Sequence, residues 1–314
     1  SSTTLAIGLP WRESGCQGIF YKGCKAMLDP DKWIWELQTA GTIFALKVKK
    51  WLIRKKTRYQ NLEIALTEDY GLAMSLDGCF MLTERDEFFY HEMLVHPVLL
   101  SLPRPSSVLI IGGGDGGALR EALRHPVKEV YLVEIDQEVL DAAMQFLEPI
   151  HKGSFYDNRV RIVTTPGEEF VLKTNVKFDA IIVDSTDPIG PARRLFEEEF
   201  FASCRKALKD KGLMALQSGT PYLHPEELTS TFRALKRLFP FVEVYLGFMP
   251  SYPSGMWSYI IAGGRPVVLR RKTLVKRYQE RKLTTKYYTP EVHLAAFTLP
   301  RFVQELLSRA SNGG

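Results

Sequence analysis

Short apolar runs alternate with amphipathic segments from residue 108 to residue 238, and this alternation constrains the fold more than any other feature of the sequence. We expect strands at 108–111, 130–134, 160–163, 180–183 and 213–217, and helices at about 117–124, 137–147, 168–172, 197–208 and 225–238. Strands that alternate with helices form a parallel sheet covered on both faces. The sequence therefore predicts an α/β fold with a doubly wound, Rossmann-like sheet.

The flanking segments follow other patterns. Residues 43–81 alternate like half-buried strands, an Asp-Gly pair at 77–78 is typical of a hairpin, and residues 84–100 predict a helix. Later strands near 242–246 and 257–262 complete the large sheet, and a terminal helix is expected at 300–309. The predicted organisation is an extension over 1–32, a small N-terminal antiparallel β-domain with a linking helix over 33–100, a Rossmann-like domain over 101–310, and a flexible tail over 311–314.

Composition excludes some classes of protein. The chain has 314 residues, 45% of them hydrophobic, and a net charge of +5. No apolar stretch is long enough to span a membrane, and we find no signal peptide pattern. A basic run over 47–58 predicts a solvated face rather than a nucleic-acid site, because no recognition-helix or zinc-finger pattern accompanies it. The cysteines lack metal-site spacing and are expected to be reduced, so we expect a cytoplasmic protein with neither nucleic acid nor membrane as a partner.

A glycine-rich turn follows the first strand of the alternating region. Gly112, Gly114 and Gly117 satisfy the pattern G-x-G-x-x-G, and Glu134 ends the next strand, where an acid can bind ribose hydroxyls. Together they predict an adenosine site but do not choose between a nicotinamide dinucleotide and a sulfonium cofactor. Asp115 favours the second, because a carboxylate in this turn repels a pyrophosphate and pairs with an amine.

Two further carboxylates, Asp184 and Asp187, follow the apolar run at 178–183. Open α/β sheets bind ligands at the carboxyl ends of their strands, so acid at that place indicates a cationic substrate, an amine. The alternative interpretation is that both are turn and cap residues.

Several motifs together resemble the spermidine synthase (polyamine aminopropyltransferase) family. They are Tyr-Gln at 59–60, Thr-Glu-Arg-Asp-Glu-Phe at 83–88, Tyr-His-Glu at 90–92, Gly-Gly-Gly-Asp-Gly-Gly at 112–117, Glu-Ile-Asp at 134–136, Asp-Ser-Thr-Asp-Pro-Ile-Gly-Pro at 184–191 and Tyr-Pro-Ser-Gly at 252–255. They occur in the family's order over roughly residues 33–305. The resemblance implies a methyltransferase-like Rossmann domain, an N-terminal β-domain, and a homodimer or homotetramer.

The resemblance also implies roles for single residues. It makes Asp184 the proton acceptor. The residues implied to bind the amine substrate are Tyr90, His91, Asp115, Ser185, Thr186, Asp187, Gln217 and Tyr252, and those implied to bind the nucleoside are Gln60, Gly112, Gly114, Glu134, Pro166, Gly167 and Pro191. One position departs from the family, which usually has Asp-Gly where this chain has Pro166-Gly167. Adenine must then be held by backbone or by a neighbour such as Glu168.

The implied reaction moves the aminopropyl group of decarboxylated S-adenosylmethionine onto putrescine, giving spermidine and 5′-methylthioadenosine. No metal is expected. Cadaverine, agmatine or a longer polyamine stay open as acceptors. The competing hypotheses are a methyltransferase that uses S-adenosylmethionine, a non-catalytic binding module, and an oxidoreductase that uses NAD.

Overall fold

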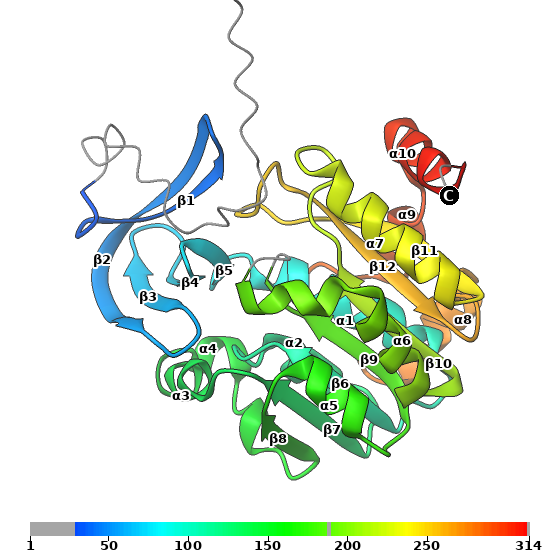
Figure 1. The fold of residues 1–314 in the computed structure, drawn as a ribbon. Coiled ribbons are helices and arrows are strands. Elements are labelled where there is room, and N and C mark those ends of the chain that lie inside the picture. The colour runs from blue at the N-terminus through cyan, green and yellow to red at the C-terminus, as the bar shows by residue number, and fades with distance from the viewer. Residues whose placement is uncertain (1–28, 187–189, 313–314) are drawn as a thin grey trace, which may run out of the picture.

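The computed structural model describes residues 29–186 and 190–312, and only the backbone at 190, 191 and 312. Two sheets organise the chain (Figure 1): a small one built from the N-terminal strands and a large one with helices on both faces. The predicted fold class is confirmed. Among the described residues, no helix combines the length and apolar character needed to cross a bilayer.

The small sheet is an antiparallel meander whose strands lie side by side in chain order. Its strands are β1 (Trp33–Thr39), β2 (Thr42–Lys56), β3 (Asn61–Thr67), β4 (Leu72–Leu76) and β5 (Cys79–Thr83). Asp77 and Gly78 both adopt positive φ angles, 50° and 79°, which is the backbone of the tight hairpin that the sequence predicted. Two register shifts in β2 let this long strand curve and pair with β1 at one end and β3 at the other.

The large sheet is parallel except for one strand. Its strands, in spatial order, are β11 (Phe241–Phe248), β12 (Met256–Gly263), β10 (Leu208–Gln217), β9 (Phe178–Asp184), β6 (Ser107–Gly112), β7 (Glu129–Glu134) and β8 (Val160–Thr164). Only β12 runs antiparallel to its neighbours β10 and β11. The chain order reverses between β6 and β9, so the sheet has its topological switch point there, where doubly wound folds bind ligands.

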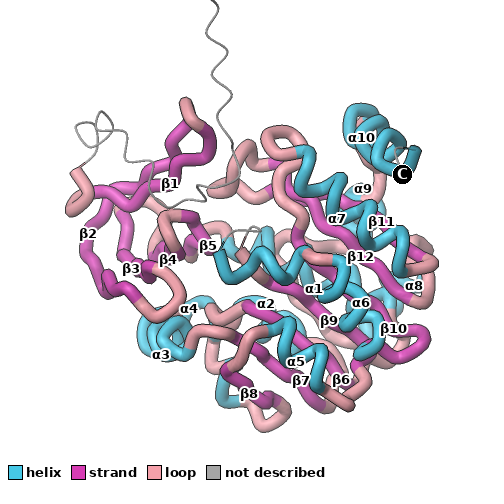
Figure 2. The backbone as a smooth tube through the Cα atoms, in the orientation of Figure 1, coloured by secondary structure: helices cyan, strands magenta, loops and turns pink. Residues whose placement is uncertain are grey.

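Helices cover both faces of this sheet, as Figure 2 shows. One face carries α1 (Glu87–Ser101), α2 (Gly117–Leu123), α3 (Gln137–Phe146), α4 (Glu148–His151), the 3₁₀ turn η2 (Ser154–Tyr156), α8 (Arg271–Glu280) and α9 (Pro290–Ala296). The other carries α5 (Gly167–Lys173), the 3₁₀ segment η3 (Gly190–Phe196), α6 (Glu198–Ala207), α7 (Pro225–Leu238) and α10 (Arg301–Asn312). Alternate side chains of a strand serve the two cores: Val108 and Ile110 face the first, Leu109 and Ile111 the second.

The first core continues into the small sheet. Leu62, Ile64 and Met74 of that sheet belong to the same buried cluster as Met93 and Leu94 of α1. Helix α1 is therefore packed between the two sheets, and the residues it carries are fixed from both sides.

Helix α1 is also held from the C-terminal part of the chain. Its last carbonyls have no partner within the helix, and Arg281 donates hydrogen bonds to Leu99 O and Leu102 O. Lower on the same helix, the carboxylate of Glu92 accepts the backbone N–H groups of residues 286–288. The segment around α8 thus braces both halves of α1.

Some expectations were wrong in detail. Helix α1 begins at Glu87 rather than at residue 84, because the backbone N–H groups of Glu84 and Arg85 bond to Leu72 O and Tyr70 O and so continue the pairing of the small sheet. Helices α8 and α9 and strand β1 were not predicted. Cys204 is free and buried, but Cys79 is disulfide-bonded, which contradicts the reduced state expected for that cysteine.

Candidate active site

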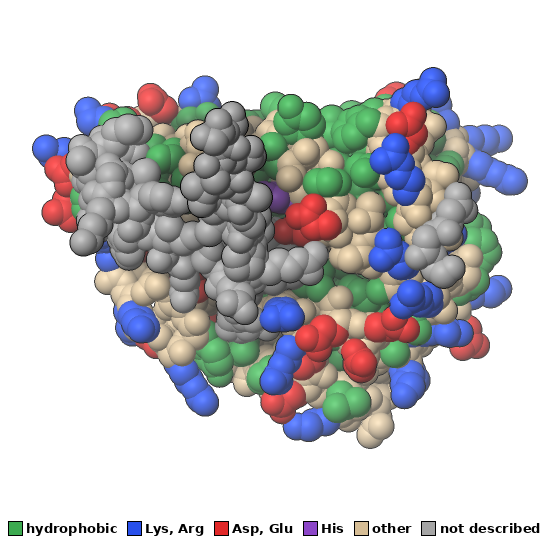
Figure 3. Space-filling model, turned by 45° about the horizontal axis from the view of Figure 1, so that its top comes forward, with side chains coloured by type: hydrophobic (Ala, Val, Ile, Leu, Met, Phe, Trp, Pro, Cys, Tyr) green, Lys and Arg blue, Asp and Glu red, His purple; other side chains and the backbone are tan. Residues whose placement is uncertain are grey.

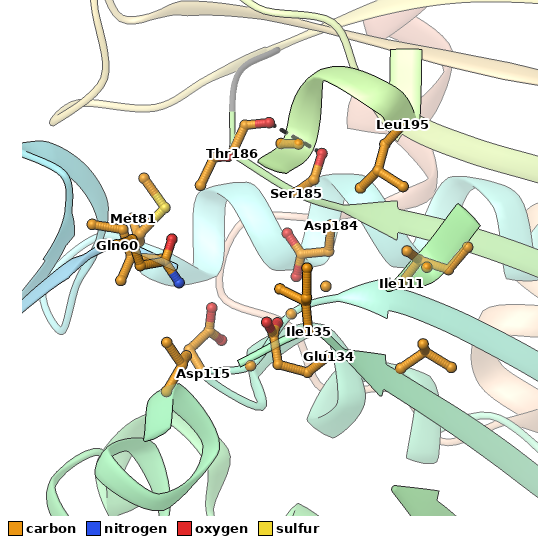
Figure 4. A pocket seen from close by; sticks show the side chains of 18 of the residues that line it. Gln60, Met81, Ile111, Asp115, Glu134, Ile135, Asp184, Ser185, Thr186 and Leu195 are labelled. Carbon is orange, nitrogen blue, oxygen red and sulfur yellow. Dashed lines mark hydrogen bonds between the residues drawn. The ribbon is translucent and has the colours of Figure 1, made fainter. Parts of the chain in front are cut away.

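A cavity lies at the carboxyl ends of β6, β7 and β9, next to the switch point of the large sheet. The carboxylates of Asp115, Glu134 and Asp184 point into it, and Gln60 of the β2–β3 turn and Met81 of β5 lie opposite (Figure 4). The two sheets therefore share the cavity. On the face of the molecule in Figure 3, basic side chains are scattered among acidic ones and form no continuous patch over the described residues.

The glycine turn fits tightly against the end of β9. Gly112 has a φ of 78°, and a Cβ there would lie 2.1 Å from the carbonyl oxygen of Asp184. The next residue, Gly113, donates its N–H to that same oxygen over 2.8 Å. A Cβ on Gly114 would lie 3.0 Å from Glu134 Oε2. These glycines are needed because the turn passes between the backbone of Asp184 and the side chain of Glu134 without room for a Cβ.

Glu134 forms one end of the cavity. Its Oε1 accepts the N–H of Asp136 over 3.0 Å, and burial raises its pKa to about 7, with the charges of Asp136 and Asp115 adding to the shift and the backbone N–H bonds opposing it. Asp136 in turn accepts hydrogen bonds from Thr57 Oγ1 (2.6 Å) and Gln60 Nε2 (3.3 Å). Gln60 is thereby held over the end of β7 that carries Glu134.

Asp184 lies at the other end. Tyr90 donates its hydroxyl to Asp184 Oδ1 over 2.9 Å, and no described residue donates a hydrogen bond to the buried Oδ2. Burial raises the pKa of Asp184 to about 6; the nearby charge of Asp115 adds to this, whereas His91 and the Tyr90 hydroxyl oppose it. A carboxylate with that pKa and one open oxygen can accept a proton near neutral pH.

Asp115 and His91 lie beside Asp184. Asp115 Oδ1 accepts the Gly117 N–H over 2.6 Å and lies 3.3 Å from His91 Nε2. Burial would raise the pKa of Asp115, but His91 and the Gly117 N–H hold it below its usual value. His91 is 1% exposed and lies behind Asp115, so it does not itself form the cavity wall.

Potential metal ligands also meet here. Ligand atoms of His91, Asp115 and Asp184 lie within 4.8 Å of one another. This set does not fit a metal ion well, because Asp115 Oδ1 already accepts the Gly117 N–H, Asp184 Oδ1 accepts the Tyr90 hydroxyl, and the ring is tied to Glu87 through Nδ1. The absence of a metal stays a prediction.

The remaining residues at the Asp184 end of the cavity divide into those that form its wall and those that support it. Tyr252 lines the cavity beside Tyr90, with ring centroids 5.6 Å apart, and donates its hydroxyl to Met81 O over 2.5 Å. Ser185 and Thr186 also line it. Gln217 is buried behind the wall, where its amide donates to Ser185 O over 3.4 Å. Asp187 lies outside the described residues.

The Glu134 end of the cavity is built mostly from backbone and apolar groups. Gly167 packs so closely on the sheet that a Cβ would lie 2.3 Å from Ile111 Cγ2. Pro166 precedes α5 as its N-cap and is not part of the wall, whereas Glu168 in the first turn is. Ile135, Ala192 and Leu195 complete this side. The side chain of Pro191 is not described.

Sequence reasoning missed four residues that support the site: Glu87, Arg120, Thr57 and Asp136. Glu87 bonds to His91, Arg120 bonds to Glu87, and the other two hold Gln60. The spacing of Glu87 and His91, four residues apart on one helix, was the available signal. No spacing in the sequence indicates the contact of Arg120 or Thr57.

Comparison with known proteins identifies the family. A family model described as a spermine/spermidine synthase domain matches residues 87–272, and one described as a spermidine synthase tetramerisation domain matches residues 32–84. This chain belongs to the spermidine synthase (polyamine aminopropyltransferase) family. The family resemblance stated from the sequence is confirmed, and so is the prediction of a transferase.

Related aminopropyltransferases match the chain over most of its length. Polyamine aminopropyltransferase of Caldicellulosiruptor bescii is 40% identical over 282 residues, which cover 90% of this chain and all of the relative. The Bacillus subtilis protein of the same name is 41% identical over 278 residues, 88% of this chain and 98% of the relative.

Solved spermidine synthases have the same fold. One, in complex with the transition-state analogue AdoDATO, superposes with a TM-score of 0.83 at 38% identity and covers 89% of this chain and 96% of that one. The enzyme of Thermotoga maritima gives 0.81 at 39% identity, covering 88% and 94%.

Proposed function

We propose that this aminopropyltransferase moves the aminopropyl group of decarboxylated S-adenosylmethionine onto putrescine, giving spermidine and 5′-methylthioadenosine. The observation that carries the proposal is the open Oδ2 of Asp184, buried in one cavity with Asp115 and with Glu134 at the opposite end. A relative solved with the analogue AdoDATO gives independent support.

The nucleoside occupies the end lined by Glu134 and the glycine turn. Glu134 accepts hydrogen bonds from the ribose hydroxyls, as acids at the end of this strand do in related folds. Gln60, Gly112 and Gly114 contact the same nucleoside, with Gly167 and Pro191 on the adenine side. Because Pro166 lacks an acceptor, Glu168 or the backbone of the α5 turn binds the adenine amino group.

The amine occupies the end lined by Tyr90, Tyr252 and Asp184. Asp187 orients its amino groups, His91 acts on them through Asp115 from behind the wall, and Ser185, Thr186 and Gln217 shape the loop around them. The amine nitrogen attacks the propyl carbon beside the sulfonium; the new C–N bond forms as the C–S bond breaks, and methylthioadenosine leaves with the electron pair. The proton lost by nitrogen goes to Asp184 Oδ2.

This arrangement suits the movement of charge in the reaction. Positive charge passes from sulfur to nitrogen, so a carboxylate close to nitrogen stabilises the transition state more than the ground state. An amine with an ordinary pKa near 10 costs about 4–5 kcal/mol to deprotonate at pH 7. The raised pKa of Asp184, caused first by burial, makes it a better acceptor for that proton.

Asp115 selects the decarboxylated co-substrate. Its carboxylate pairs with the amine of the aminopropyl group and repels the carboxylate that S-adenosylmethionine would bring to the same place. We also propose a homodimer or homotetramer in the cytoplasm, without a metal, and with the domain boundaries given from the sequence. The name of the family model matched by residues 32–84 supports the oligomer.

The test is one incubation of the protein with decarboxylated S-adenosylmethionine and a panel of putrescine, cadaverine, agmatine and spermidine, followed by mass spectrometry. We expect methylthioadenosine together with spermidine from putrescine, at the highest rate of the panel. A parallel incubation with S-adenosylmethionine should give no methylated amine. Preferred use of another acceptor would overturn the assignment of putrescine as the substrate. Methylated product would support a methyltransferase instead.

A further inference from the structure

The imidazole of His91 faces a carboxylate at each of its nitrogens. Glu87 Oε2 is hydrogen-bonded to Nδ1 over 2.7 Å, whereas Asp115 Oδ1 lies 3.3 Å from Nε2 as an ion pair without the alignment of a hydrogen bond. A neutral imidazole has only one N–H, so its other nitrogen would direct a lone pair at a carboxylate. The geometry therefore favours the ring that carries a proton on both nitrogens.

Glu87 is itself fixed by a residue of the neighbouring helix. Arg120 of α2 binds both oxygens of the Glu87 carboxylate, over 3.0 and 2.9 Å. The guanidinium is anchored in turn by Glu121 at 2.8 Å and by the carbonyl of Ile150. This two-point binding of a carboxylate by arginine gives a defined orientation as well as charge compensation.

The ring itself has little freedom to turn away. Helix α2 begins so close to α1 that a Cβ on Gly117 would lie 2.2 Å from His91 Cε1. The third glycine of the G-x-G-x-x-G turn thus contacts the imidazole. Glu87 at one nitrogen, Asp115 at the other and Gly117 against the ring together fix both the position and the orientation of the His91 imidazole.

We propose that Glu87, oriented by Arg120, is a positioning residue that holds His91 as an imidazolium against Asp115 and so lowers the negative charge at the amine end of the cavity. The role assigned to that end rests on the proposed function. Arg120, Glu87, His91 and Asp115 then form a chain of alternating charges that leads from the interior to the cavity.

The charged and titratable groups around His91 are consistent with a cation. Glu87 on its own helix, Asp115 in the glycine turn and Asp184 on β9 are carboxylates, against the single guanidinium of Arg120 on α2; the Tyr90 hydroxyl is neutral. Burial alone would lower the pKa of His91, but Asp115 and Glu87 raise it well above its usual value.

The consequence concerns deprotonation of the substrate amine. Because Glu87 is already paired with Arg120, the carboxylates of Asp115 and Asp184 would, without a further cation, bind an ammonium strongly and make its proton harder to remove. A fixed imidazolium beside Asp115 offsets part of that field without filling the cavity, because the ring lies behind the wall. The amine is then bound by Asp184 and its neighbours, yet it can still reach the neutral, nucleophilic form.

The direct test is nitrogen-15 NMR of the histidine side chains in the intact protein between pH 5 and 9. The chain has six histidines, so the His91 signal is assigned by its loss in His91→Gln. We expect both His91 nitrogens to show the protonated, imidazolium pattern at pH 7. A neutral pattern for His91 at pH 7 in the wild-type protein would overturn the proposal without reference to any variant.

The variant test compares Glu87→Gln with Glu121→Gln. Both remove one carboxylate from Arg120, but only Glu87 contacts His91. We expect Glu87→Gln to lower the pH at which His91 loses its proton by roughly 1–3 units. We also expect it to lower kcat for the amine by about tenfold while KM for the amine stays the same or falls. The matched control should leave the His91 signals unchanged.

The outcomes separate this inference from the proposed function. If the His91 pattern is that of an imidazolium and depends on Glu87 but no amine panel gives product, the charge assignment stands and the proposed reaction fails. If spermidine forms and Glu87→Gln behaves like Glu121→Gln in NMR and in kcat, the reaction stands and the positioning role is wrong. Circular dichroism of both variants establishes that each is folded.

Discussion

The two ends of the cavity are lined by different kinds of groups. At the amine end, side chains from α1, the glycine turn and β9 bond to one another, and charge sets their protonation: Asp184 is raised in pKa and Asp115 is lowered. At the nucleoside end, glycines and apolar groups make most of the wall, and Glu134 is the main acid, held by a backbone N–H.

The difference indicates how each end tolerates change. An end made of side chains that bond to one another loses its geometry and charge balance when one of them is altered, because the others lose a partner or a charge. An end made largely of backbone keeps its shape when a side chain changes, which fits the presence of Pro166 where the family usually has an acid. Substitutions at the amine end should therefore affect turnover, and those at the nucleoside end should affect binding.

The largest effect is expected for Asp184→Asn. Turnover should fall by roughly 10²–10⁴, the usual contribution of a general base, while the dissociation constant of the nucleoside substrate changes little. Stopped assays of spermidine formation and calorimetric titration with methylthioadenosine measure the two quantities. Asp179→Asn is the matched control. Asp179 lies at the other end of β9 from Asp184, where its carboxylate accepts the N–H groups of Ser106 and Ser107, away from the cavity. Wild-type turnover in Asp184→Asn would remove that residue from its assigned role.

The next effect is expected for Glu134→Gln. At a pH above about 8, where Glu134 is ionised, loss of this charged acceptor for the ribose hydroxyls costs about 1.5–3 kcal/mol. KM for the nucleoside substrate should rise by roughly 10–100-fold, and kcat should stay within about threefold. Steady-state kinetics at saturating amine measure both. Glu138→Gln, which alters a surface acid paired with Lys55, should leave both constants unchanged. A loss confined to kcat would contradict the division into two ends.

A smaller effect concerns pH. Asp184 must be ionised to accept a proton, so kcat/KM for the amine should fall as pH drops below about 6. In Asp115→Asn the like charge is gone, and the acidic limb should move to lower pH by about one unit. Rates measured from pH 5 to 9 test this, and an unchanged limb in the variant would show that Asp115 does not act on Asp184.

The ionisation of Asp184 that favours activity at higher pH should lower the free energy of unfolding. The pKa of Asp184 is raised on folding from 3.8 to about 6, so the folded state binds its proton more tightly than the unfolded state. Its contribution is most favourable below pH 3.8 and is lost as pH rises to about 6, at a cost of ~3 kcal/mol. Urea unfolding at pH 7 should therefore show Asp184→Asn to be more stable than the wild type; equal stability would count against burial of a charged Asp184.

The smallest effect is expected for Pro166→Asp. It restores an acceptor beside the adenine side of the cavity, and one added hydrogen bond contributes about 0.5–1.5 kcal/mol. The dissociation constant of methylthioadenosine should fall by roughly 3–10-fold, and aspartate is also a favourable N-cap for α5. Pro166→Ala separates the loss of proline from the gain of the acid. Weaker binding by Pro166→Asp would mean that Glu168 or the backbone already fills this role.

The fold and the site differ in how far the sequence could predict them. The ends of parallel strands meet at one edge, so Asp115, Glu134 and Asp184 could be placed together from their positions after apolar runs alone. The contact of Tyr90 with Asp184 joins residues 94 positions apart and follows only from the packing of α1 on the sheet. The binding of Glu87 by Arg120 depends likewise on how α2 lies against α1. Local patterns cannot encode such contacts, because the partner is chosen by the tertiary structure.

The brace that Arg281 and residues 286–288 form on α1 has a consequence for how far the catalytic unit extends. The matched synthase domain ends at residue 272, yet the helix that presents Tyr90 and His91 is gripped at both ends by a stretch of chain beyond that limit. A fragment that ended at residue 272 would keep every residue that lines the cavity. It would lose the contacts that fix the position of α1 and so of Tyr90 and His91. In this enzyme the shortest catalytic unit therefore extends beyond the matched synthase domain.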